Sequence, residues 1–205
     1  FYYANGPEGL SDAEISAAVD KFLADLPAPP KKVLLLPPDI TRLHSFGGVL
    51  ASKLYHRLKD FCTVHLMPAL GTHEPMTKQE RDMFFDSIPD ECFLVHNWRE
   101  DVVKIGEVPG EFVKEVSEGI MDEPIDVEIN KALLEGGYDV IVSLGQVVPH
   151  EVVGMANYTK NILVGVGGSR MINRSHMLGA LYGMERMMGR DHTPVRKVFD
   201  YAHEH

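Results

Sequence analysis

Apolar residues near the start of the chain recur with the period of an amphipathic helix. Ser11 and Glu14 form the sequence signature of a capping box. Ile15 and Val19 then begin a series of apolar positions at helical spacing. The pattern predicts a helix over residues 11–26, which the following PAPP stretch ends.

Farther along, short apolar runs alternate with longer amphipathic stretches. The segments that predict strands are KKVLLL, FCTVHLMPAL, ECFLVHNW, YDVIVSLGQVVPH and, with a turn, NILVGVGG. The segments that predict helices are GGVLASKLYHRLKDF, TKQERDMFFDSI, INKALLEGG and RSHMLGALYGMERMMG. An irregular stretch over residues 99–125, rich in Gly, Glu and Val, is expected to contain a β-ribbon.

Strands that alternate with helices are typical of an α/β fold with a mainly parallel sheet flanked by helices. We expect a Rossmann-like arrangement with an irregular β-ribbon insertion. The predicted organisation is an N-terminal helical segment over residues 1–30, an α/β domain over 31–190 and a polar tail over 191–205. Ligands of such sheets bind at the carboxyl ends of the strands.

Charge and cysteine usage narrow the expected partners. The net charge of −10 argues against nucleic acid or an anionic membrane, because both need basic residues to meet phosphates. No apolar run approaches the roughly 20 residues of a membrane span. Cys62 and Cys92 lie in apolar segments without ligand spacing, as expected of thiols in a reducing compartment. We therefore expect a cytoplasmic protein without a nucleic-acid or membrane partner.

Polar residues follow several of the predicted strands. Asp39 and Arg42 follow VLLL, and His73 follows VHLMPAL. His96 follows CFLV, and His150 follows VIVSLGQVV. In a parallel sheet these residues meet at one edge, where arginine can bind a carboxylate and histidine can transfer protons. The pattern indicates a small anionic substrate that undergoes proton transfer.

Each of these residues also has an ordinary structural interpretation. Asp39 suits a turn or helix cap, with Thr41 as a second cap, and Arg42 can pair with Asp39. His73 can be a surface turn residue, and His96 can close a strand by hydrogen bonding. We favour a shared site because so many chance placements would have to converge.

Two features near the C-terminal end have open interpretations. GVGGSR lacks the third glycine of a dinucleotide fingerprint, so Gly167 and Gly168 form either a tight turn or a contact for phosphate at a helix N-terminus. The following helix, expected to begin near Asn173, presents His176 in its first turns. One imidazole suits nickel, zinc or copper but does not define a metal site.

Several ordered motifs together resemble a known family. These are PPDITR, ALGTHEPMT, VPH, the lysine ten positions after that histidine, and a histidine sixteen positions later. Over residues 32–189 the chain is similar to the amino-terminal domain of the nickel-pincer lactate racemase family, the LarA-like proteins. The resemblance implies an isomerase that inverts 2-hydroxy acids.

The resemblance also implies a cofactor, the nickel-pincer nucleotide (pyridinium-3,5-bisthiocarboxylic acid mononucleotide nickel). Lys160 would tether it covalently, and His176 would be the protein ligand on nickel. We expect Thr41, Gly167 and Gly168 to contact the cofactor as well.

By the same resemblance, His73 and His150 form an acid/base pair, and Arg42 with Asp39 positions the substrate. The family acts by hydride transfer. One histidine takes the hydroxyl proton while hydride leaves the carbon, and the resulting ketoacid is reduced again on its other face.

Two departures from the family pattern shape the expectations. The family loop resembling GFSGGAK is GMANYTK here, where Tyr158 and Thr159 replace small residues, so the substrate is lactate or a larger hydroxy or sugar acid. The family's carboxyl-terminal domain, which closes the site, does not follow in this chain. We expect that domain of the same protein as a partner, homo-oligomers as a possible assembly, and no activity from the isolated fragment.

Two alternatives from other classes stay open on sequence alone. One is a non-catalytic domain that binds an anion or a nucleotide. The other is a metal hydrolase with His73, His150 and His176 as the metal ligands.

Overall fold

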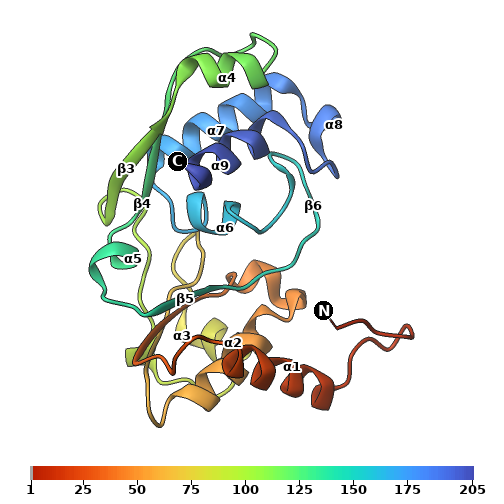
Figure 1. The fold of residues 1–205 in the computed structure, drawn as a ribbon, viewed down its shortest axis with the longest axis vertical. Coiled ribbons are helices and arrows are strands. Elements are labelled where there is room, and N and C mark those ends of the chain that lie inside the picture. Colours follow the sequence, from red (N-terminus) through yellow and green to blue (C-terminus); the bar gives the residue numbers. More distant parts are fainter. Residues whose placement is uncertain (1) are drawn as a thin grey trace.

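A parallel sheet forms one half of the fold in the computed structural model, which describes residues 2–205. Its three strands, in the order β2-β1-β5, are Thr63–Leu66, Lys32–Leu36 and Val140–Ser143. Figure 1 shows this sheet below an antiparallel ribbon and its helices, with α6 between the two. The predicted α/β class, with a parallel sheet and a β-ribbon, is confirmed; residue 1 of the predicted N-terminal segment lies outside the described residues.

The two faces of β1 pack against different helices because its side chains alternate. Val33 and Leu35 face α1 (Asp12–Ala24), α2 (Gly47–Leu58) and α3 (Lys78–Phe84). Leu34 and Leu36 pack on the opposite side against α5 (Ala132–Glu135) and α6 (Lys160–Leu163). Since both faces are covered, the strand reads as a continuous apolar run.

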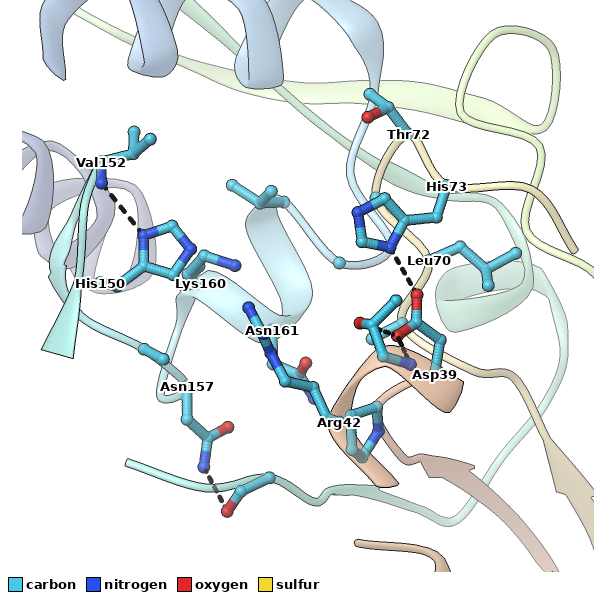
Figure 2. Close-up of a pocket in the computed structure, with 18 of the residues that line it drawn as sticks. Asp39, Arg42, Leu70, Thr72, His73, His150, Val152, Asn157, Lys160 and Asn161 are labelled. Carbon is cyan, nitrogen blue, oxygen red and sulfur yellow. Dashed lines mark hydrogen bonds and ion pairs between the residues drawn. The ribbon is translucent and has the colours of Figure 1, made fainter. Parts of the chain in front are cut away.

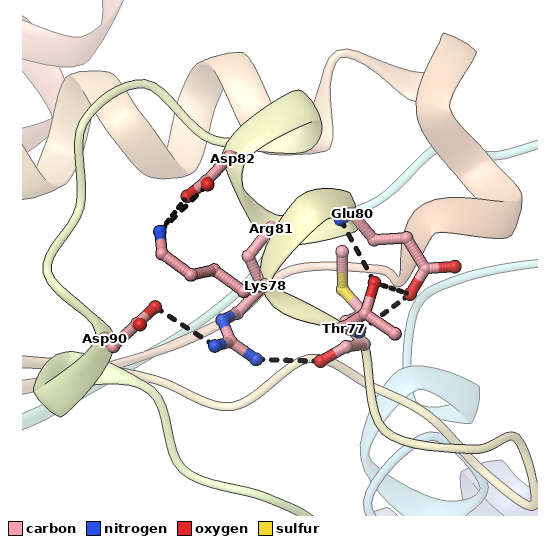
Figure 3. A network of polar contacts seen from close by, with 7 residues as sticks. Thr77, Lys78, Glu80, Arg81, Asp82 and Asp90 are labelled. Atoms are coloured by element: carbon pink, nitrogen blue, oxygen red, sulfur yellow. Dashed lines mark hydrogen bonds and ion pairs between the residues drawn. The ribbon is translucent and has the colours of Figure 1, made fainter.

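The predicted capping box of α1 is present, and α3 has a second one that was not predicted. Ser11 and Glu14 cap α1 reciprocally, and Thr77 and Glu80 do the same for α3. Figure 3 shows the capping box of α3. Next to it, the guanidinium of Arg81 donates to the Met76 carbonyl oxygen at 2.7 Å. These bonds fix the point at which the loop after β2 ends and α3 begins.

The other half of the fold is built on an antiparallel ribbon. Strand β3 (Val102–Val108) pairs with β4 (Ile125–Asn130), and α4 (Gly110–Val116) connects them. Helix α7 (Ser169–Tyr182), the short α8 (Met184–Met187) and α9 (Pro194–Glu204) complete this half. Two short strands, β6 (Pro149–His150) and β7 (Gly154–Met155), pair with each other ahead of α6.

Segment ECFLVHNW was predicted as a strand, and this is wrong. Only Phe93 makes a single parallel bridge, to Leu66, after the 3-10 turn Asp90–Cys92. The chain then leaves the sheet because the His96 ring is buried against the other half of the fold.

The prediction of a strand in NILVGVGG is also wrong. Lys160–Leu163 form the helix α6, and Gly165 then turns the chain by donating to the Lys160 carbonyl oxygen at 3.1 Å. In INKALLEGG, Ile129 and Asn130 end β4, so the helix is limited to α5. Helix α7 begins at Ser169 rather than near Asn173.

Residues 191–205 are not the polar tail that the sequence predicted. Thr193 caps α9, and Pro194 occupies its first turn. Val195, Val198 and Phe199 lie at helical spacing and are fully buried in the core beneath α7 and the ribbon. The helix forms because that apolar stripe finds a surface to cover. In the part of the chain that the structure describes, no helix has both the length and the apolar character to cross a membrane.

Candidate active site

A cavity of about 230 Å³ lies at the carboxyl ends of β1 and β2. Its walls come from the loops after these strands, the segment from Gly145 to Lys160, and α7. Figure 2 shows His150 and His73 on opposite sides of the cavity, with Lys160 and Arg42 between them in this view. The sequence-predicted residues that line it are Asp39, Thr41, Arg42, His73, His150, Lys160 and His176.

Asp39 is a turn cap and a site residue at the same time. Its Oδ1 accepts hydrogen bonds from the Thr41 amide at 3.0 Å and the Thr41 hydroxyl at 2.5 Å. Its Oδ2 lies 2.5 Å from Nδ1 of His73. Since a carboxylate only accepts hydrogen bonds, Nδ1 of His73 carries the proton and Nε2 keeps a lone pair. The buried Asp39 thus orients His73 as a base.

The loop that carries His73 is fixed by contacts across the cavity. Gly71 adopts a left-handed φ of 58°, which costs a glycine little, and its amide donates to the Gly165 carbonyl oxygen at 2.8 Å. The amide of His73 donates to Leu70 at 2.9 Å. The first of these bonds joins the His73 loop to the turn that follows α6, and the second lies within the loop.

His150 has the opposite tautomer. Its Nδ1 accepts a hydrogen bond from the Val152 amide at 3.1 Å, so a neutral ring carries its proton on Nε2. Burial and, to a smaller extent, the positive charge of Lys160 lower the pKa of His150 to about 4, although Glu151 opposes the shift. The His150 ring is therefore neutral at pH 7 and can donate from Nε2.

The buried neutral state of His150 predicts a loss of stability in acid. An unfolded histidine has a pKa near 6.5, so the unfolded chain binds more protons at lower pH. The stabilisation is fully present above about pH 6.5 and is lost as pH falls towards about 4, by up to about 3 kcal/mol. We expect His150→Gln to flatten this acid dependence of the urea-derived free energy of unfolding. His192→Gln, at a side chain 85% exposed, is the control, and an equal slope in wild type and His150→Gln would contradict the assignment.

Lys160 begins α6 and is partly buried. Burial and, to a smaller extent, the nearby charge of Arg42 lower the pKa of its amine to about 8. Glu151 and Asp39 partly offset these effects. A lysine in this environment is uncharged more often than a surface lysine, which makes the amine available as a nucleophile.

His176 comes from the middle of α7. Its Nδ1 lies 2.7 Å from the Ile172 carbonyl oxygen, which can only accept, so Nε2 keeps a lone pair. Burial lowers the pKa of His176, and the bond to Ile172 opposes that shift. A neutral imidazole whose other nitrogen donates to a carbonyl is the usual form of a histidine metal ligand.

Among residues 2–205, no group of three or more His, Cys, Asp and Glu side chains is placed to hold a metal ion. His73, His150 and His176 line one cavity without converging on a single point. The hydrolase alternative therefore lacks its three-ligand site in this part of the chain. A metal on His176 would need further ligands from an organic group or from other parts of the protein.

The structure does not bring His96 to the cavity. Its ring is 3% exposed, and its Nε2 donates to the Gly167 carbonyl oxygen at 3.0 Å. The Asn130 amide donates to its Nδ1 at 2.9 Å. Both ring nitrogens are occupied, and the structural interpretation of His96 holds.

Gly167 and Gly168 also lie away from the cavity wall, which contains Gly165 instead. A Cβ on Gly168 would lie 2.3 Å from Oε2 of Glu128, and this oxygen accepts the Arg170 amide at 2.9 Å. A carboxylate thus occupies the N-terminus of α7, where one of the two open interpretations placed phosphate. These glycines allow the backbone to approach β4.

Asn161 was missed by sequence reasoning. Its Nδ2 donates to the Leu36 carbonyl oxygen at 3.0 Å and the Ser143 hydroxyl at 2.9 Å. These bonds tie α6 to the ends of β1 and β5, so Lys160 stays at the sheet edge. The only local signal was the polar asparagine beside Lys160 in NYTKN.

Comparisons with known proteins agree with this geometry. The family model described as the lactate racemase N-terminal domain matches residues 10–189. A structural genomics target from Thermotoga maritima has a TM-score of 0.88 at 27% identity, over 100% of this chain and 49% of its own. The lactate racemase apoprotein of Thermoanaerobacterium thermosaccharolyticum has a TM-score of 0.68 at 22% identity, over 93% and 46%, and this likeness shows the fold alone. No curated protein matches, and the chain spans about half the length of the solved structures that it resembles.

Proposed function

The chain belongs to the lactate racemase N-terminal domain family, and on this basis we propose that the whole protein is a racemase or epimerase of 2-hydroxy acids. The observation that carries the proposal is the pair of unequal histidines in one cavity. His73 has a free Nε2 and a buried carboxylate bonded to its Nδ1, whereas a neutral His150 carries its proton on Nε2 and can donate it. Two proton-transfer groups on different elements suit a reaction that inverts a carbon.

Arg42 is suited to hold the substrate carboxylate. It lines the cavity between the two histidines, and a guanidinium binds a carboxylate through two parallel hydrogen bonds. A carboxylate fixed in this way leaves the hydroxyl end of the molecule free to turn from one histidine towards the other.

His73 then takes the hydroxyl proton on Nε2 as the substrate is oxidised. Asp39 stabilises the imidazolium that forms, because its Oδ2 faces the Nδ1 proton at 2.5 Å. Inversion ends with a proton delivered to the same oxygen on the other side, so His150 must be protonated at that point. The bound carboxylate is expected to raise the low pKa of His150, since a negative charge favours the imidazolium.

Lys160 and His176 fit the family's cofactor. The amine of Lys160 has a lowered pKa, and His176 presents a free Nε2 in the same cavity. We propose that Lys160 holds the nickel-pincer nucleotide covalently and that His176 ligates its nickel. When bound, this group supplies the acceptor and donor of hydride for the substrate carbon.

The proposed substrate is lactate or a larger hydroxy or sugar acid. Tyr158, which suggested a changed cavity shape, is 60% exposed and does not line the cavity. The side chains of Gln146 and Asn157 line it instead and offer polar contacts to additional hydroxyl groups. Polar walls of this kind are compatible with a polyhydroxylated acid.

The proposal is tested with full-length protein produced with nickel and the cofactor-maturation enzymes. We expect it to convert single enantiomers of one 2-hydroxy acid in a chiral panel, as measured by chiral chromatography. Substrate deuterated at C2 should keep its deuterium, because hydride does not exchange with water. Binding without inversion by cofactor-loaded protein would favour a non-catalytic binding domain, and loss of deuterium to solvent would contradict hydride transfer.

A further inference from the structure

Helix α9 holds the loop that leads to Lys160, although it lies beyond the residues matched by the family model. At its N-terminus, the Thr193 hydroxyl donates to the Val153 carbonyl oxygen at 2.6 Å. The Thr193 hydroxyl oxygen in turn accepts a hydrogen bond from the Arg196 amide at 3.1 Å. The first turn of α9 is therefore joined to the start of the loop.

The guanidinium of Arg196 makes the remaining contacts. Its Nη1 donates to the Thr159 hydroxyl at 2.9 Å. Its Nη2 donates to the carbonyl oxygens of Met155 at 2.7 Å and Asn157 at 3.3 Å. Arg196 is only 5% exposed, so these acceptors compensate for the removal of its charge from water.

The loop that Arg196 holds has an unfavourable backbone. Asn157 and Tyr158 adopt left-handed φ values of 66° and 55°. This conformation costs a residue other than glycine roughly 1–2 kcal/mol. It persists here because the guanidinium binds acceptors on both sides of the left-handed pair. Lys160 follows directly, so the direction of its side chain depends on this conformation.

We propose that Arg196 is a positioning residue for Lys160, which it serves by holding residues 155–159 in the conformation that directs the amine into the cavity. The proposal rests on the proposed role of Lys160 in cofactor attachment. It also links the two cofactor residues, because α9 packs against α7, the helix that carries His176. A helix outside the matched family region thereby orders the site.

The test compares Arg196→Ala and Arg196→Lys with wild type in the full-length protein. We expect Arg196→Ala to lower the rate of adduct formation on Lys160 by about 10- to 100-fold, since small displacements of a reacting group have effects of this size. Arg196→Lys should fall between the two, because an ammonium can replace only part of the planar fork. Guanidinium chloride at millimolar concentration should restore part of the Arg196→Ala rate, whereas sodium chloride should not.

Arg186→Gln is the matched control, because it removes an exposed arginine paired with Glu118. Thr159→Val removes only the hydrogen bond between Arg196 and the Thr159 hydroxyl. This milder variant tests the proposal even if Arg196→Ala does not fold. In cofactor-free protein, hydrogen exchange of amides 156–161 should accelerate in the Arg196 and Thr159 variants and not in the control.

Unchanged exchange at amides 156–161 in the folded variants would overturn the role of Arg196. So would a loading defect of equal size in Arg186→Gln, or acceleration spread evenly over all helices. Absence of any adduct in wild-type protein would instead overturn the proposed function, so the two failures are distinguishable.

Discussion

Lys160→Ala is expected to abolish covalent cofactor loading and, with it, racemisation. In the described part of the chain, Lys160 is the lysine that lines the cavity, and its pKa is lowered to about 8 by burial and by Arg42. Alanine leaves no nucleophile at the end of the loop that directs this side chain. The measurement is intact-protein mass spectrometry of the full-length protein after maturation, followed by the chiral assay.

Two matched variants separate chemistry from charge. Lys160→Arg keeps the positive charge but lacks a nucleophilic amine, so it should also remain without an adduct. Lys53→Ala removes a lysine that pairs with Asp12 away from the cavity and should load normally. An adduct of normal mass on Lys160→Ala would rule out the proposed attachment.

The second large effect is expected at the two histidines. His73→Gln and His150→Gln should each reduce racemisation by about 100- to 10,000-fold, the range for a lost acid or base. His150→Gln should still oxidise one enantiomer to the ketoacid in a single turnover, because His73 keeps a free Nε2. His73→Gln should oxidise neither enantiomer at a comparable rate, because the neutral His150 carries its proton on Nε2. Full racemisation by either variant would exclude that histidine from the reaction.

Asp39→Asn tests the tautomer of His73 within the same experiment. An asparagine amide can donate to Nδ1, which would place the ring proton on Nε2 and remove the base. The loss of racemisation should approach that of His73→Gln, and single-turnover oxidation should be lost as well. An activity near that of wild type would show that the contact between Asp39 and His73 does not set the tautomer.

Much of the fold depends on residues that are close in sequence and was therefore predictable. The capping boxes of α1 and α3 lie within four-residue segments, and the apolar runs of β1 and β2 are continuous. Segments that depend on distant partners were not predictable. The apolar NILVGVGG begins a helix because Asn161 is bonded to the ends of β1 and β5.

The roles of His73 and His96 also depend on distant partners and could not be predicted from nearby residues. His73 and His96 both follow apolar runs, and nothing in their immediate neighbours separates them. His96 meets Asn130 and Gly167, which are 34 and 71 positions away in the chain, and these contacts occupy both nitrogens. His73 meets Asp39 through one nitrogen only and keeps the other free.

Local sequence thus accounts for the α/β pattern, for the helix caps and for the order of the motifs that identify the family. Tertiary structure decided which polar side chains share the cavity and in which protonation state. It also turned the apparent tail into α9, which brings Arg196 to the Lys160 loop. A buried charged or polar side chain is stable only where hydrogen-bonding partners surround it. In this protein those partners come from parts of the chain that are distant in sequence.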